Sequence, residues 1–170
     1  MGTLGIDRAG ISAVRMAGGG EWLVRPADGR LDEEFEVLLA EVTFASGIDP
    51  GDVWVDGGDR QALLRAPDVV RSIARRHLIA CRVERLDAFA ARAELGRLAE
   101  LGVRLVILEP RGGRDAEGPE ALADAIRVRA LCRRAHVNGM SVLAQCDPED
   151  DIAAMSALGV DLVRERGNAA

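Results

Sequence analysis

Short apolar runs alternate along the chain with longer segments in which apolar residues recur at helical spacing. The apolar runs predict strands over 11–16, 22–25, 53–55, 78–83, 104–108, 142–144 and 160–163. The helical spacing predicts helices over 31–46, 61–76, 88–101, 119–137 and 148–158. Pro67 either breaks the second helix or starts a new one. Continuous apolar strands that alternate with helices are typical of a parallel sheet covered by helices.

The number of predicted strands limits the possible folds. Six or seven strands fit in 170 residues, whereas a complete eight-fold barrel usually needs about 250 residues and at least about 200. We therefore expect an α/β fold, either a trimmed TIM-like (βα) barrel or an open doubly wound parallel sheet. Residues 1–170 should form a single domain, because no low-complexity segment and no linker interrupts the pattern.

The composition of the chain limits the kinds of partner and the cellular location that we expect. The net charge of −6 argues against nucleic acid as a partner, although all 22 basic residues are arginine and lysine is absent. No apolar run reaches 18 residues and the start of the chain does not resemble a signal peptide, so we expect neither a membrane partner nor export. Three widely spaced cysteines fit buried thiols in a reducing cytoplasm.

Segments in a fixed order carry a family resemblance. Glu21-Trp22-Leu23-Val24-Arg25 lies in a short apolar strand, and three segments follow it in order: Val53–Gly58, Gly102–Glu109 and Gly139–Gln145. Their order and spacing resemble the EAL family, the barrel phosphodiesterases that linearise cyclic di-GMP. The resemblance covers nearly the whole chain, from about Ile11 to Arg166. It implies a trimmed barrel of EAL type, with one mouth where the family binds Mg²⁺ or Mn²⁺.

The resemblance also implies a vestigial ligand site at that mouth. Its residues would be Glu21, Trp22, Arg25, Asp56, Glu84, Glu109, Gln145 and Arg164. The two arginines would contact phosphates, and Trp22 would either belong to the core or stack on a base at the edge of the mouth. A residual metal would be Mg²⁺ on Glu21, Asp56 and Glu109, which requires Glu21 and Glu109 at the same end of the sheet. Glu84 corresponds to a loop-anchoring Glu of the family, or it simply lies beside a helix N-cap.

Several residues depart from the family pattern. Cys81, Leu108 and Gln145 stand where the family has carboxylates, and a leucine cannot ligate a metal. The family's general-base lysine is missing: either its strand is deleted, or 125–129 is that strand with Arg127 in the lysine position. We favour a long helix over this region, and arginine cannot act as the base. We therefore expect no catalytic residue, no bound metal and no cofactor.

The function expected from this pattern is a catalytically inactive EAL-like signalling domain in the cytoplasm that acts by binding a regulatory protein. Two alternatives stay open: a cyclic di-GMP receptor without hydrolysis, and a weak metal-dependent phosphodiesterase. The C-terminal third also resembles glycerophosphodiesterases, but the His-Arg-Gly strand that opens that family is absent. A homodimer also stays open.

Polar residues outside the expected mouth receive simpler interpretations. His77 and His136 precede strands, and we expect both to be structural. Basic helix faces are expected around Arg71, Arg75 and Arg76 and around Arg127, Arg133 and Arg134. Solvation is their usual explanation, with docking of a partner as the alternative.

Overall fold

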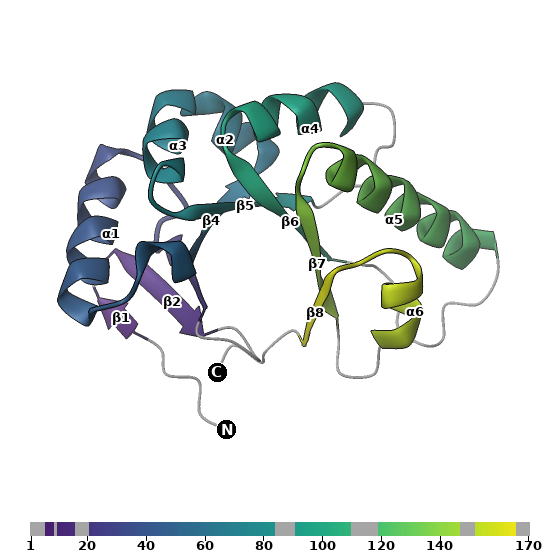
Figure 1. Ribbon diagram of the computed structural model, residues 1–170, viewed down its shortest axis with the longest axis horizontal. Coiled ribbons are helices and arrows are strands. Elements are labelled where there is room, and N and C mark those ends of the chain that lie inside the picture. Colours follow the sequence, from purple (N-terminus) through teal and green to yellow (C-terminus); the bar gives the residue numbers. More distant parts are fainter. Residues whose placement is uncertain are drawn as a thin grey trace.

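One curved sheet organises the molecule (Figure 1). A computed structural model of the chain describes residues 6–8, 10–15, 21–83, 91–109, 119–146 and 152–165. Over these residues the eight strands lie side by side in chain order. They are β1 (Ile6–Arg8), β2 (Ile11–Arg15), β3 (Trp22–Pro26), β4 (Val53–Asp59), β5 (Leu78–Val83), β6 (Val103–Leu108), β7 (Ser141–Cys146) and β8 (Leu162–Glu165).

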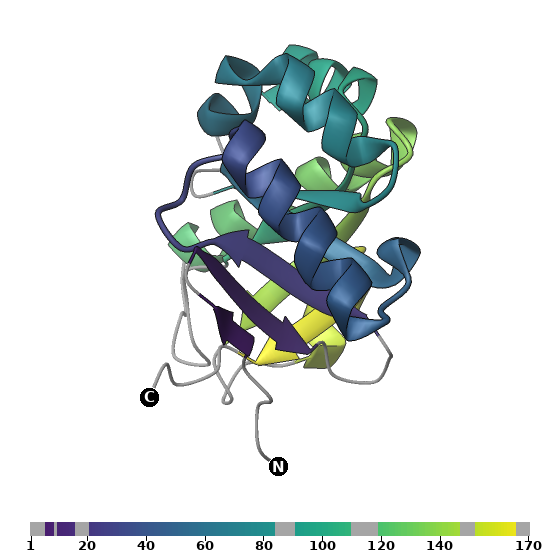
Figure 2. The same cartoon turned by 90° about the vertical axis from the view of Figure 1, so that its left-hand side faces the viewer.

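The helices cover the outer, convex face of this sheet (Figure 1). They are α1 (Glu33–Ser46), α2 (Arg60–Arg65), α3 (Pro67–Ala74), α4 (Ala91–Glu100), α5 (Pro119–Val137) and α6 (Ile152–Ala157), with a short 3₁₀ turn at Pro50–Asp52. Figure 2 shows α1 lying across the outer face of the first strands. Within the described residues, no helix combines the length and the apolar character needed to cross a bilayer.

Strand order and direction decide how the chain winds. β1, β2 and β3 form an antiparallel meander, and from β3 to β8 every neighbouring pair is parallel. When successive parallel strands are neighbours and each crossover has the same right hand, all crossover helices lie on one face of the sheet. A doubly wound sheet has helices on both faces, so that alternative is wrong.

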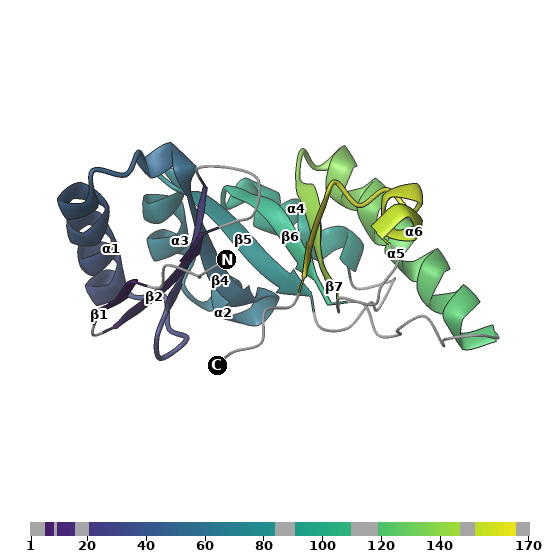
Figure 3. The same ribbon diagram turned by 90° about the horizontal axis from the view of Figure 1, so that it is seen from below.

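The sheet curls but does not close. Among the described strands, β1 pairs only with β2 and β8 pairs only with β7, which leaves an open half-barrel. Figure 3, seen from below, shows the helices along the outside of this curve. The α/β class is therefore confirmed, whereas the antiparallel start and the strand β1 were not predicted.

Most element boundaries follow the local sequence signals. Pro67 begins a new helix, because its ring cannot continue α2 but fits the first turn of α3. The helix expected over 119–137 is observed as α5. Arg127 therefore lies on a helix, and the interpretation of 125–129 as a lysine-bearing strand is wrong.

Apolar side chains pack on both faces of the sheet. The larger cluster fills the space between the outer face and the helices, with Val55, Ile79, Val106 and Val142 at its centre. A smaller cluster lies on the inner face, and its members are Leu23, Ala80, Leu105, Ile107 and Leu143, with Trp54 packed against them. Strand side chains alternate between faces, so each strand from β3 to β7 contributes to both clusters.

Gly102 allows helix α4 to turn closely into β6. Its φ is +96°, and a Cβ at this position would lie 2.5 Å from Cβ of Ala74. Gly102→Ala should therefore destabilise the fold by about 2 to 4 kcal/mol, from backbone strain plus the clash. Gly139→Ala is the matched control, because φ is +69° there but the added Cβ meets open space. Urea unfolding should show a cost of only about 1 kcal/mol for the control; equal costs would contradict the close packing.

His77 is buried before β5, with Nδ1 3.3 Å from the carbonyl oxygen of Pro50. Burial lowers its pKa, so the folded state favours neutral imidazole more than the unfolded chain does. This contribution to stability is complete above the unfolded pKa of about 6.5 and is lost as pH falls through the lower folded value. The free energy of unfolding should drop between about pH 7 and pH 5. The drop should shrink in His77→Gln when this variant and the original chain are unfolded with urea at each pH.

Candidate functional site: a charged inner rim

A row of polar side chains crosses the inner face of the half-barrel. Each of the six parallel strands, β3 to β8, contributes one residue, which lies two positions after an apolar residue on the inner face or directly at the end of the strand. These residues are Arg25, Asp56, Arg82, Glu109, Gln145 and Arg164. We call this row the inner rim. The alternation of strand side chains places it directly beyond the inner apolar cluster, towards the C-terminal ends of the strands.

Arg82 joins two carboxylates at the centre of the inner rim. Its Nε and Nη2 donate to Oδ2 of Asp56 at 2.8 and 2.6 Å, and its Nη1 donates to Oε1 of Glu109 at 2.9 Å. Asp56 is only 3% exposed, and its Oδ1 also accepts a hydrogen bond from the backbone N–H of Gly58. One guanidinium therefore satisfies carboxylates from the strands on either side of its own, in the forked geometry that arginine favours.

The electrostatics of the inner rim follow from this contact. The hydrogen bonds and charge of Asp56 raise the pKa of Arg82, with a further contribution from Glu109. Burial lowers the pKa of Arg164, and the positive charges of Arg82 and Arg25 lower it further. Three guanidinium groups thus lie near one another and face only two rim carboxylates.

Gln145 and Arg164 extend the rim beyond Glu109. They are register partners on β7 and β8, and both side chains are half-buried, whereas Arg25 at the other side of the rim is exposed. Beneath the rim, Trp54 packs on the inner apolar cluster, and its Nε1 is buried without a hydrogen-bond partner among the described residues. This surface therefore offers several N–H donors.

Glu21 and Trp22 do not belong to the inner rim. Val24 pairs with Val55, so Glu21 lies four residues before the level of Asp56, about 13 Å along the strand direction. Glu21 immediately precedes β3 and Glu109 immediately follows β6, so they flank opposite ends of parallel strands. The requirement that both lie at one end is not met, which counts against the family assignment.

Trp22 is the first residue of β3 and packs against the outer core, so its expected role as a stacking platform at the mouth is wrong. The alternation of side chains explains the error. Leu23 points inward, so Trp22 must point outward.

The substitutions at Cys81 and Leu108 also have a different meaning. Both side chains are buried in the outer core beneath the helices, so neither occupies a ligand position on the inner face. Burial, together with the negative charges of Asp59 and Asp56, raises the pKa of the Cys81 thiol to about 12. This cysteine is therefore a packed core residue and not a reactive or metal-binding thiol.

Three expectations remain: the role of Glu84, the role of His136 and the metal site. Glu84 lies outside the described residues. His136 takes part in a structural contact, because its Nε2 lies 2.9 Å from Oδ2 of Asp161. The same oxygen accepts a hydrogen bond from the backbone N–H of Val142. Within the described residues, no group of three or more His, Cys, Asp or Glu is arranged as a metal site.

Arg82 is the residue that sequence analysis missed. The signal was present in the strand itself, since Ile79 and Cys81 alternate with Ala80 and Arg82. An alignment by family motif instead drew attention to Cys81, one residue away and on the other face of the sheet. Comparison with known proteins adds no further constraint, because no family model and no curated protein matches the chain.

Removing Arg82 should leave Asp56 as a buried charge without its partner. Arg82→Met should therefore lower the free energy of unfolding by about 3 to 5 kcal/mol. The double variant Asp56→Asn with Arg82→Met should recover at least half of this loss, since no unpaired carboxylate remains. Arg104→Met, at an exposed position, should change stability by less than about 0.5 kcal/mol. Urea unfolding of the original chain, the single variants Arg82→Met and Asp56→Asn and the double variant measures the coupling, and additive losses would exclude it.

Proposed function

We propose that this protein is a non-catalytic binding domain that acts through a protein partner. We also propose that the chain shares its origin with the trimmed barrels of EAL type, without their activity. The order of the quoted segments and the inward-facing Arg25 and Asp56 support this common origin, whereas the position of Glu21 opposes it. The proposed cytoplasmic location is supported by the burial of all three cysteines, Cys81, Cys132 and Cys146.

The salt bridge of Arg82 with Asp56 and Glu109 is the observation that carries the proposal. A catalytic divalent ion requires free carboxylate oxygens, and here the guanidinium takes the place that a cation would occupy between them. A metal would have to displace a hydrogen-bonded, partly buried arginine, whose fixed positive charge also repels it. Without a metal, in-line attack on a phosphodiester loses both water activation and leaving-group stabilisation.

An anion receptor is the second candidate, and the rim arginines favour it. Arg25 and Arg164 have no carboxylate partner among the described ion pairs, and the mutual repulsion of the three guanidinium groups would be relieved by a bound anion. The buried Nε1 of Trp54 offers a further donor beneath them. A phosphate-bearing ligand such as cyclic di-GMP would fit these donors, and metal would not be needed.

Hydrolysis and binding of cyclic di-GMP can be measured on the same samples. We expect no linear product with Mg²⁺ or Mn²⁺, because the carboxylates are occupied, and no binding heat with or without Mg²⁺. Turnover that is lost in Asp56→Ala would overturn the non-catalytic proposal. Copurification of one stoichiometric protein partner with the folded chain would support it.

Metal-independent binding would favour the second candidate. In that case Arg25→Ala should weaken binding by at least about tenfold, as expected for loss of one phosphate contact. Arg104→Ala, at the N-terminal end of β6, is the matched control and should leave the affinity unchanged.

A further inference from the structure

The outer surface of α1 is acidic and apolar. Glu34, Val37, Glu41 and Phe44 recur at helical spacing along one exposed face, and Phe44 is 90% exposed. We call these residues the α1 stripe. It contains no basic residue, and more than half of the surface of each of its two large apolar side chains, Val37 and Phe44, is exposed.

The outer surface of α5 has the opposite charge. Its exposed face carries the α5 stripe, which consists of Leu122, Ile126, Arg129, Arg133 and Val137. The spacing of these residues puts them within one narrow band of the helix surface, and Val137 is 87% exposed. Among the ion pairs of the described residues, the acidic residues of α5 take part only in the bridge of Arg127 to Asp124, which lies beside the stripe. The stripe is thus basic and apolar.

The two stripes cannot meet within one molecule, because α1 and α5 lie at opposite ends of the half-barrel (Figures 1 and 3). Their charges and apolar side chains are nevertheless complementary. We propose that the α1 stripe of one copy docks on the α5 stripe of a second copy. The contact would bury apolar side chains that are otherwise in water and would neutralise both sets of charges.

Such a contact joins two different surfaces, so it is head-to-tail. It closes into a ring if the geometry returns to the first copy, and otherwise forms a chain. Two helices of 14 and 19 residues give a small interface, and we expect a dissociation constant on the order of 10 to 100 μM. Because the charges are exposed, association should weaken between about 0.05 and 0.5 M salt. This inference goes beyond the proposed function and does not depend on the inner rim.

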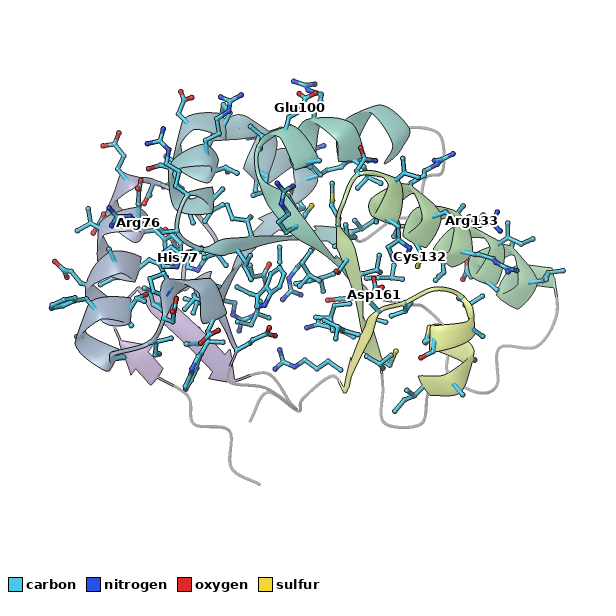
Figure 4. The ribbon with its side chains drawn as sticks, viewed as in Figure 1. Arg76, His77, Glu100, Cys132, Arg133 and Asp161 are labelled. Atoms are coloured by element: carbon cyan, nitrogen blue, oxygen red, sulfur yellow. The ribbon has the colours of Figure 1, made fainter. Side chains whose placement is uncertain are left out.

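Figure 4 shows that Arg133 projects from the outer side of α5, away from Cys132 and Asp161. This position makes Arg133 suitable for a charge-reversing substitution. Arg129→Glu with Arg133→Glu makes both stripes acidic. Glu34→Arg with Glu41→Arg makes both stripes basic. Copies of one double variant repel each other, because the α1 stripe and the α5 stripe then have the same charge. In a mixture, both stripes of one variant can pair with stripes of opposite charge on the other variant. Arg127→Glu reverses one charge beside the stripe, half of the change in the double variant of α5, and serves as the control.

Sedimentation equilibrium on the full chain tests the proposal. Each double variant should raise the dissociation constant of self-association by at least about tenfold, and an equimolar mixture of the two should restore association. Arg127→Glu should stay within about twofold of the original chain, and circular dichroism should confirm that all variants are folded. A chain that remains monomeric up to about 1 mM would overturn the proposal. Association that both double variants retain, or a mixture that stays dissociated, would overturn it as well.

Discussion

The guanidinium of Arg82 links three neighbouring strands of the half-barrel through two salt bridges. β5 supplies the arginine, β4 supplies Asp56, and Glu109 follows β6. A buried carboxylate is costly unless a charge or hydrogen bonds compensate it, so the inner face can carry Asp56 only because Arg82 lies beside it. The same contact consumes the oxygens that a divalent cation would need. The salt bridges that stabilise the inner rim therefore also occupy carboxylate oxygens that could otherwise bind a cation.

The one-sided winding of the sheet decides which surfaces remain for binding. Because the crossover helices all cover the outer face, the inner face keeps its polar rim, and the helices present their outer sides to solvent. The outer sides differ in charge, with acidic residues on α1 and basic residues on α5. The half-barrel thus has two kinds of surface, an arginine-rich inner rim and charged helix stripes. Their consequences can be tested independently.

The fold could be predicted further from the sequence than the site. The strand 78–83 and the helix 119–137 were predicted with the observed boundaries, because continuous apolar runs and helical spacing are local signals. The antiparallel pairing of β1 to β3 and the open edge at β8 depend on which segments meet in space, and no local pattern encodes that.

The site depends on a finer property, the face of each strand on which a residue lies. A shift of one residue moves a side chain from the inner face to the outer core. Cys81 and Arg82 are adjacent in sequence, yet the first is a buried thiol beneath the helices and the second is the centre of the rim. Asp56, Glu109 and Arg164 lie on the inner rim, each two positions after an apolar residue, Trp54, Ile107 and Leu162. Glu21 precedes β3 and Trp22 begins it, where a motif gives no information about the level along the strand. The register of β3 to β6 therefore decides the centre of the inner rim, because it places the guanidinium of Arg82 between the two carboxylates.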